Sequence, residues 1–280
     1  MFQRDRVLRA GEGEGPGHGT PRGRSSSADS GWAAAMGGRI LAAGAAVLVL
    51  AACASGPAYE GMSADELFQW AQAHYESGDY EDAVEGFEQF LATHTTDPRQ
   101  AEAQYLLARS FKEKGEELSA VAEFERFQQR WTVHPLSPDV ALGICEAYAS
   151  LSPIPQRDQT YTRQAADACG RTALEFQNHD AAHAADSIRA EMVERLARRE
   201  YEVGRFYQRR DLHDSALLSF ERVLNEFPDS EVVPRALLSK YRSYRAIGWD
   251  AEADEAREDL LALFPDTDEA RELASDGNGG

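Results

Sequence analysis

A 37-residue repeat constrains this chain more than any other feature of its sequence. Four sets of small and aromatic residues share one spacing, and in each set 12 residues separate the first member from an Ala. Such a fixed period indicates stacked copies of one structural unit. The sets are Ala71, Gly78, Ala83 and Phe87; Ala108, Gly115, Ala120 and Phe124; Gly204, Ala216, Phe220 and Pro228; and Tyr241, Gly248, Ala253 and Pro265.

This spacing is similar to that of the tetratricopeptide repeat, a pair of antiparallel helices. A small residue on the first helix faces a small residue on the second, so the two backbones can approach closely. The aromatic residue one turn further on fills the space between repeats. A Gly at the turn ends the first helix, because Gly readily adopts the left-handed C-cap conformation.

The middle of the chain fits the same pattern with two changes. Residues 142–148 predict a third first helix, but residues 152–158 contain two prolines and cannot continue it. We expect its second helix at about 160–176 and one long helix from 181 to about 210. The sequence thus predicts an all-α tetratricopeptide solenoid of about five helix pairs. The third pair has a long loop and the fourth an extended first helix.

An apolar run near the N-terminus predicts where the protein is sent. Residues 40–50 are apolar, follow Arg39 and precede Ala51-Ala52-Cys53. Eleven residues are too few to cross a bilayer, which takes about 20. A basic start, a short apolar stretch and small residues make a secretory signal. A Cys directly after the small pair resembles a bacterial lipobox, in which the new N-terminal Cys53 carries a diacylglycerol and a fatty acid. An ordinary signal peptide with a chance Cys is the alternative.

These features divide the chain into five parts. Residues 1–35 are rich in Gly, Ser and Arg and lack apolar periodicity, so Met36 is the expected start. The predicted parts are a disordered extension (1–35), a lipoprotein signal peptide (36–52), a tether (53–61), the repeat domain (62–270) and a disordered tail (271–280).

The charge of the chain excludes one class of partner. It carries 29 Lys and Arg against 48 Asp and Glu, a net charge of −19. Removing residues 1–52, with six Arg and four acidic residues, leaves 23 against 44, or −21. Such an acidic body repels nucleic acid and anionic head groups. A lipid anchor is therefore expected to hold the protein to the membrane, and no nucleic acid is expected to bind.

The order of lipobox, short tether and five repeats resembles the BamD family, also called ComL or YfiO, of outer-membrane assembly lipoproteins. The resemblance covers about residues 53–268. The chain departs from the family at Thr95-Thr96, where Tyr-Pro is usual, and in its two extra cysteines. The segments that carry the resemblance are Phe124-Glu125-Arg126-Phe127 with His134-Pro135 and Asp139-Val140, then Arg157-Asp158-Gln159, residues 194–201 and residues 206–210.

The resemblance implies a subunit of the machinery that assembles β-barrels. Its partners would be the barrel-assembly protein, other assembly lipoproteins and unfolded barrel precursors with a C-terminal aromatic signal. The protein would face the periplasm from the outer membrane, since Ala54 rather than Asp follows Cys53. The alternative is a tetratricopeptide scaffold lipoprotein for cell-wall, pilus or other envelope complexes.

Stacked helix pairs curve, and their first helices line a concave groove. Aromatic side chains there would hold apolar side chains of an extended peptide, and Arg109 and Lys112 would meet its terminal carboxylate. The alternative is a solvated helix face with incidental aromatics. The predicted groove residues are Phe68, Gln72, Tyr75, Tyr105, Arg109 and Lys112.

Two cysteines fall within the third repeat. Cys145 stands at the small position of its first helix, and counting back from Phe176 places Cys169 where other repeats have Phe87 and Phe124. Those positions pack together, and the compartment is oxidising, so a disulfide is compatible with the pattern. Two buried thiols acting as small apolar groups are equally compatible.

No motif predicts catalysis. His179 and His183 lie four residues apart, as in a zinc-protease helix, but Asp180 stands where that motif has Glu, and no third ligand follows. A helix start with Asp180 near the N-cap is the better interpretation. We find no Ser-His-Asp order, phosphate loop or CxxC, and predict a non-enzyme without metal or cofactor other than the lipid on Cys53.

Overall fold

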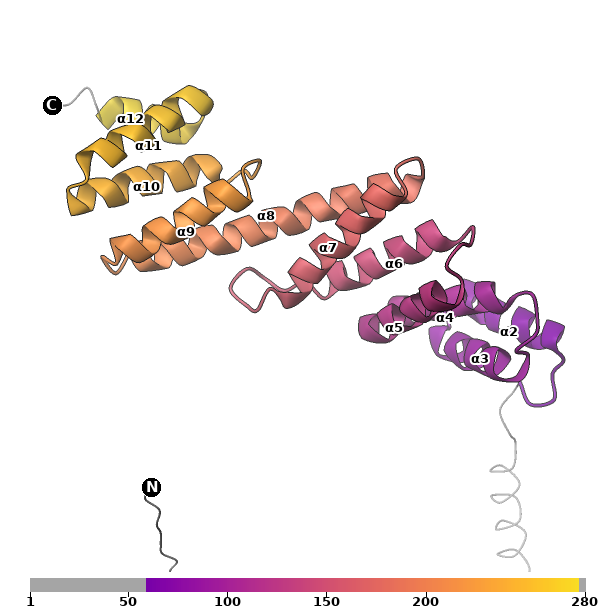
Figure 1. Ribbon diagram of the computed structural model, residues 1–280. Helices are drawn as coiled ribbons and strands as arrows, with labels where there is room; N and C mark the ends of the chain where they lie inside the picture. Colours follow the sequence, from indigo (N-terminus) through magenta and orange to yellow (C-terminus); the bar gives the residue numbers. More distant parts are fainter. Residues whose placement is uncertain (1–58, 277–280) are drawn as a thin grey trace, which may run out of the picture. The chain divides into compact units, whose positions relative to one another are not determined.

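The computed structural model describes residues 59–276, and within this range it holds eleven α-helices and no β-strand (Figure 1). The predicted all-α class is confirmed. The helices are α2 (Ala64–Ser77), α3 (Tyr80–Thr93), α4 (Gln100–Glu113), α5 (Glu117–Arg130), α6 (Ser137–Ser150), α7 (Thr160–Glu175), α8 (Asp180–Gln208), α9 (His213–Glu226), α10 (Val233–Ile247), α11 (Asp250–Leu263) and α12 (Asp268–Asp276).

The helices α2 to α11 form five consecutive pairs. Each helix packs against its neighbour in the chain, first within a pair and then between pairs. The third pair, α6 and α7, has the predicted long loop, and α8 is the predicted long helix, with 29 residues. In the part of the chain described, no helix is both long enough and apolar enough to span a membrane.

Small residues set the distance between neighbouring helices, both within a pair and between pairs. A Cβ added at Gly143 would lie 2.4 Å from the Phe124 ring, and one added at Gly204 would lie 2.5 Å from the Phe220 ring. These glycines therefore allow a buried aromatic ring to lie against the helix backbone. At the turn between α2 and α3, Gly78 has a φ of 83°, the left-handed conformation that ends the first helix.

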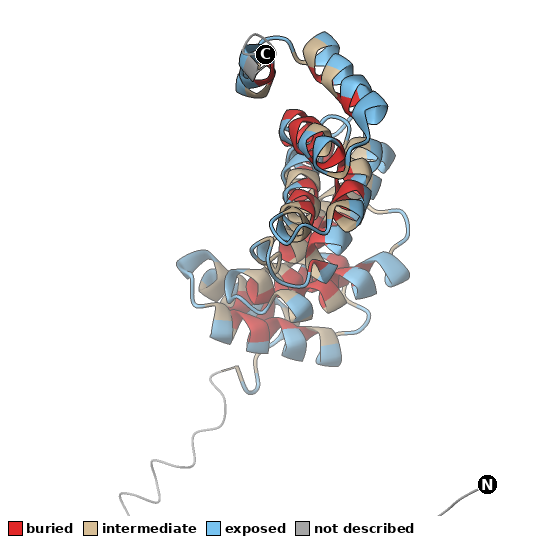
Figure 2. Cartoon of the chain, turned by 90° about the vertical axis from the view of Figure 1, so that its left-hand side faces the viewer, coloured by how far each residue is buried: buried red, intermediate tan, exposed pale blue. Residues whose placement is uncertain are grey.

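Two large hydrophobic clusters follow one another along the chain. The first extends from α2 to the early part of α8, where Ala185 and Ile188 belong to it. The second extends from Ala197 and Tyr201 of α8 to α12. Figure 2 shows the buried positions along the sides of helices that face one another. The helix α8 thus contributes successive parts of its length to both clusters.

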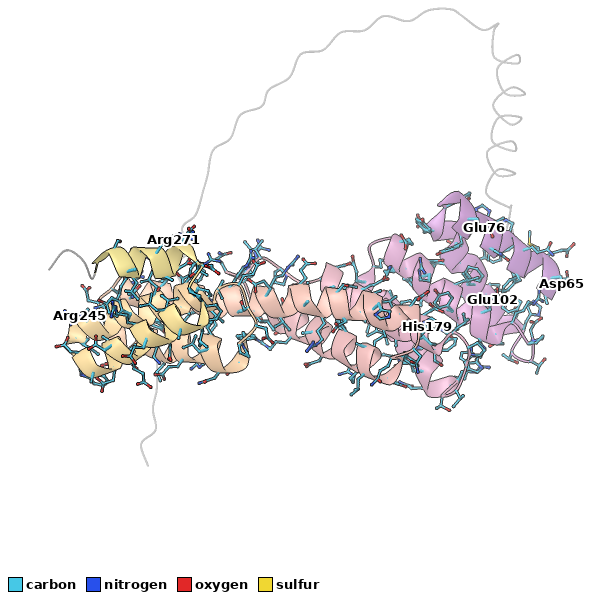
Figure 3. All side chains as sticks on the ribbon, turned by 90° about the horizontal axis from the view of Figure 1, so that it is seen from above. Asp65, Glu76, Glu102, His179, Arg245 and Arg271 are labelled. Atoms are coloured by element: carbon cyan, nitrogen blue, oxygen red, sulfur yellow. A yellow bond between two sulfur atoms is a disulfide. The ribbon has the colours of Figure 1, made fainter. Side chains whose placement is uncertain are left out.

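The predicted tail from residue 271 was wrong over its first six residues. The helix α12 continues to Asp276, and Ala270 and Leu273 are each only 1% exposed. The helix α12 packs on α10 and α11, and Arg271 is one of its residues (Figure 3). The last repeat of an array has an apolar side that must be covered. Ala270 and Leu273, three residues apart, supply that cover and were the sequence signal for this helix.

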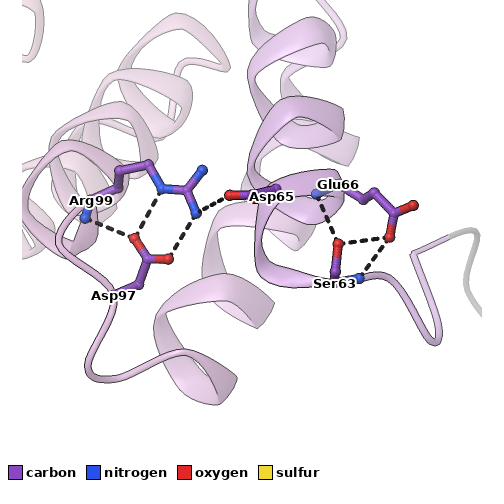
Figure 4. Close-up of polar contacts among 5 residues, drawn as sticks. All are labelled: Ser63, Asp65, Glu66, Asp97 and Arg99. Atoms are coloured by element: carbon purple, nitrogen blue, oxygen red, sulfur yellow. Dashed lines mark hydrogen bonds and ion pairs between the residues drawn. The ribbon is translucent and has the colours of Figure 1, made fainter.

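The start of the domain also differs from the prediction. Tyr59, assigned to the tether, packs edge-on against the Trp70 ring with centroids 5.6 Å apart. At the start of α2, Ser63 and Glu66 form a capping box (Figure 4). Tyr59 therefore already packs on α2.

A second polar cluster joins α2 to the turn before α4. The Arg99 side chain donates to both oxygens of Asp97, at 2.9 and 2.7 Å, and its Nη2 lies 2.8 Å from Asp65 (Figure 4). These hydrogen bonds and the nearby guanidinium lower the pKa of Asp97 to about 2. The fold therefore stabilises the ionised form of the Asp97 carboxylate relative to the unfolded chain.

Acid should weaken the fold through this group. The unfolded pKa of Asp is about 3.9. The stabilisation from Asp97 should be complete above about pH 4 and lost as the pH falls through about 2. We expect Asp97→Asn to lower the melting temperature at pH 5 and to have little effect near pH 2, measured by circular dichroism. Asp254→Asn, which removes an exposed carboxylate of α11, should have little effect at either pH. An Asp97→Asn effect independent of pH would contradict this account.

Candidate functional site

Three of the predicted groove residues come together on α2 and α4. The Arg109 guanidinium donates to the Tyr105 hydroxyl at 3.1 Å and lies 3.4 Å from Glu113. The Tyr75 ring packs edge-on against Tyr80 with centroids 5.9 Å apart. We call Tyr75, Tyr80, Tyr105, Arg109 and Glu113 the tyrosine–arginine cluster.

The pKa of Tyr75 is affected by the other members of this cluster. Burial raises this pKa, Arg109 opposes the rise, and Glu113, Tyr105 and Tyr80 add to it. The Nε of Arg109 is buried and has no hydrogen-bond partner among the described residues. Because a buried guanidinium N–H is normally paired, this Nε is an unsatisfied donor within the described structure.

The structure differs from the prediction at Phe68, which lies in the core. Its side chain is 5% exposed and packs edge-on against Phe87 and Phe90, with centroids 5.9 and 5.3 Å away. The Arg99 guanidinium lies 4.9 Å from its ring and covers it from the direction of α4. Phe68 therefore supports the first repeat and is not available to a peptide.

The remaining two groove residues are occupied by neighbours in the chain. Lys112 forms an ion pair with Glu146, which joins α4 to α6. Gln72 donates to Glu76 on its own helix at 2.8 Å. Lys112 is thus held by an ion pair to α6, whereas the buried Nε of Arg109 has no partner in the described structure.

The sequence prediction missed Tyr80 and Glu113 as members of the cluster. Glu113 lies four residues after Arg109 on α4, so helical spacing alone could have found it. Tyr80 is the first residue of α3, a second helix, and the predicted groove used only first helices. No periodic signal in the sequence marks it.

The structure joins Cys145 of α6 to Cys169 of α7 in a disulfide, with Cα atoms 4.8 Å apart. Both residues are fully buried. The bond links the two helices on either side of the long loop of the third repeat. Cys53, the predicted lipidation site, lies outside the described residues.

The paired histidines do not form a metal site with other residues of the described chain. His179 is itself the N-cap of α8, since its Nδ1 accepts a hydrogen bond from the Ala181 backbone N–H at 3.1 Å. The helix therefore starts at Asp180, next to its N-cap, as the sequence predicted. His183 lines an open cleft of about 470 Å³ between α7 and α8.

One other group of metal-ligating types occurs within residues 59–276. The His74 Nδ1 lies 3.3 Å from Asp79 and 3.6 Å from Asp82, beside the turn between α2 and α3. These contacts place the imidazole beside both carboxylates at the turn.

Comparison with known proteins places the chain among outer-membrane lipoproteins. A family model described as "YfiO: Outer membrane lipoprotein" matches residues 60–260. The putative outer membrane protein assembly factor BamD of Aquifex aeolicus is 26% identical over 186 residues, 65% of this chain and 61% of that protein. The chain thus matches about three fifths of that relative's length.

Two further similarities extend the comparison. The outer membrane protein assembly factor BamD of Neisseria meningitidis serogroup A is 24% identical over 214 residues, 72% of this chain and 80% of that protein. A thermophilic TPR protein of Thermus thermophilus has a crystal structure that matches at a TM-score of 0.31 and 21% identity. That match covers 76% of this chain and 98% of the other.

Proposed function

Because this chain belongs to the YfiO family of outer membrane lipoproteins, we propose that it takes part in the assembly of outer-membrane proteins. The observation that carries the proposal is the extent of the family match, which runs from residue 60 to 260 and covers four helix pairs and most of the fifth. A match restricted to one repeat would indicate only a common helical unit. The match instead extends over nearly the whole array.

The proposed location is the periplasmic face of the outer membrane. A diacylglycerol and a fatty acid on Cys53 would hold the protein there. Tyr59, which packs on α2, lies six positions after Cys53. An extended segment of that length spans at most about 20 Å. The first repeat, which supplies Tyr75 and Tyr80 of the tyrosine–arginine cluster, would therefore lie close to the membrane surface.

The proposed ligand of the tyrosine–arginine cluster is the C-terminal segment of an unfolded barrel precursor. Such a segment offers aromatic side chains and a terminal carboxylate. Tyr75 and Tyr105 provide aromatic surface, and the Arg109 side chain, which is 32% exposed, provides a charged donor. A guanidinium binds a carboxylate with charge-assisted hydrogen bonds, which are stronger than neutral ones.

Reversing the charge at Arg109 should abolish this binding. We expect Arg109→Glu to weaken binding of a peptide with a C-terminal Phe and free carboxylate by about tenfold or more, because a carboxylate would then face a carboxylate. Fluorescence anisotropy with a labelled peptide measures the affinity. The same peptide with an amidated C-terminus should bind the unaltered protein as weakly as the free acid binds the variant.

The control for this experiment is Arg163→Glu, a charge reversal on the exposed side of α7. It changes the net charge by the same amount but leaves the cluster intact. If both variants lose affinity equally, long-range charge and not the cluster determines binding. If neither does, the peptide does not bind at Arg109.

The proposed protein partners are the barrel-assembly protein and other assembly lipoproteins. Affinity purification of the full-length, acylated protein from solubilised membranes tests this part. Recovery of the barrel-assembly protein in comparable amount supports it. Recovery of cell-wall or pilus-assembly proteins in its place would favour the alternative, a tetratricopeptide scaffold for another envelope complex.

A further inference from the structure

The length of α8 leaves part of its surface without the cover that a regular repeat array provides. Elsewhere the first helix of a repeat packs on the second helix of the repeat before it, as α4 does on α3 and α6 on α5. The end of α7 lies beside the start of α8, where Arg189 contacts Gly170. The last turns of α8 extend beyond this contact into the second hydrophobic cluster.

An open cleft of about 350 Å³ lies along these last turns. One lining residue, Gln156, comes from the long loop of the third repeat, and the others belong to the end of α8. Phe206, 44% exposed, is the largest apolar side chain there. The other lining residues used below are Arg199, Val203, Tyr207 and Arg209.

A cation lies over this exposed ring, and two more line the cleft. The Arg210 guanidinium stacks 3.6 Å from the Phe206 centroid, and the Tyr207 ring packs edge-on at 5.5 Å. Across residues 59–276, neither Arg199 nor Arg209 has a carboxylate oxygen within 4.0 Å, although the whole chain carries 48 acidic residues. Glu202 is the one acidic residue that lines the cleft. The cleft is therefore a local basic surface on an acidic protein.

Both walls of the cleft are held in place. In the loop, buried Gln159 donates to the backbone oxygens of Ile154 and Arg157 at 2.9 and 3.0 Å. Arg195 of α8 donates to the Ser152 backbone oxygen at 3.3 Å and so ties the loop to the helix. At the other end, Gln208 donates to the Ser239 backbone oxygen at 2.8 Å and fixes α8 to α10. A cleft with fixed walls loses little conformational entropy when a ligand binds.

We propose that this cleft binds an acidic segment of a partner protein. An aromatic or large aliphatic side chain of the segment packs on Phe206 and Val203, and its flanking carboxylates pair with Arg199 and Arg209. Charge complementarity indicates an acidic ligand. The acidic chain as a whole repels acidic peptides, so such a peptide can bind only where unpaired cations lie together, as they do in this cleft. This site is separate from the tyrosine–arginine cluster and does not depend on the proposed function.

Three sets of short, fluorescein-labelled peptides test the site on the intact protein. In the first set Asp and Glu flank a Phe, in the second Lys replaces the acidic residues, and in the third Ser replaces the Phe. We expect saturable binding of the first set only, weakened by added salt as the charges are screened. Arg199→Glu combined with Arg209→Glu should weaken it about tenfold or more, and Phe206→Ser should do the same.

Arg205→Glu is the matched control, because it reverses a charge in the same turns of α8 at a residue that does not line the cleft. It should leave the affinity within about twofold of the unaltered protein. Circular dichroism should show the same melting temperature for all variants, since the altered side chains lie at the surface. Equal binding of acidic and basic peptides would overturn the proposal, as would full binding by the Arg199 and Arg209 variant.

Discussion

A Cys53→Ser variant should leave the membrane fraction and appear in the soluble periplasmic fraction. Serine lacks the thiol that a diacylglycerol needs, and the lipoprotein signal would then not be processed as one. Each buried methylene of an acyl chain contributes about 0.8 kcal/mol to membrane binding, and stable attachment takes two such signals. The rest of the expected mature chain carries a net charge of −21, which opposes binding to anionic head groups without the lipid.

Fractionation and labelling with radioactive palmitate measure this result. Cys145→Ser combined with Cys169→Ser is the control, because it removes two cysteines but leaves Cys53, and it should stay in the membrane fraction with its label. Palmitate labelling and membrane association of the Cys53→Ser variant would show that the lipoprotein hypothesis is wrong. Export without labelling in the unaltered protein would favour an ordinary signal peptide.

The spacing of small residues was enough to predict the helix pairs. Ala71 and Ala83 are fully buried in the first pair, and Gly204 touches the Phe220 ring in the fourth. Each pair has its own turn and its own close contact, so local sequence determines local structure. The long loop and α8 were also predictable, because Pro153 and Pro155 interrupt one helix and no such signal interrupts the other.

Features that depend on the neighbouring repeat were harder to predict. Phe68 stands at a groove position by spacing, yet Arg99 from the next repeat covers its ring. Lys112 stands at another, yet Glu146 of the third repeat binds it. Nothing in the sequence near either residue records these partners. The N-cap role of His179 depends on the backbone conformation before α8, which helix periodicity does not specify.

The tyrosine–arginine cluster was predictable only in part, because its members come from more than one helix. Tyr105, Arg109 and Glu113 occupy one face of α4 at four-residue spacing, so they meet on one helix. Tyr75 joins them from another repeat, and its pKa reflects their charges. The repeat register placed Tyr75 on the correct face, but only the structure associates Tyr80 with it.

Breaking the Cys145–Cys169 bond should produce the largest loss of stability among the changes considered for the folded domain. The two residues are 24 apart in sequence, and the closed segment includes the whole loop between α6 and α7. The loop-entropy model gives about 3 kcal/mol for a bond across a segment of this length, chiefly by restricting the unfolded chain. Replacing both cysteines by Ala should lower the free energy of unfolding by about that amount.

Urea unfolding of the unaltered protein, with and without reductant, provides the matched comparison because it changes no side chain. The reduced protein and the double-Ala variant should unfold at similar, lower urea concentrations, and reductant should have no effect on the variant. Alkylation of denatured periplasmic protein without reductant, followed by mass spectrometry, should find neither Cys145 nor Cys169 labelled. Two labelled thiols would show that the bond does not form in the cell.

The consequence of the bond extends beyond the third repeat. Gln156 belongs to the loop inside the closed segment, and Arg195 ties that loop to α8. Without the bond, α6 and α7 are free to separate, and amide hydrogen exchange should accelerate first in these two helices and in residues 151–159. If exchange accelerates equally in α10 and α11, the bond stabilises the array as one cooperative unit. Acceleration confined to the third repeat would show that each repeat opens largely on its own.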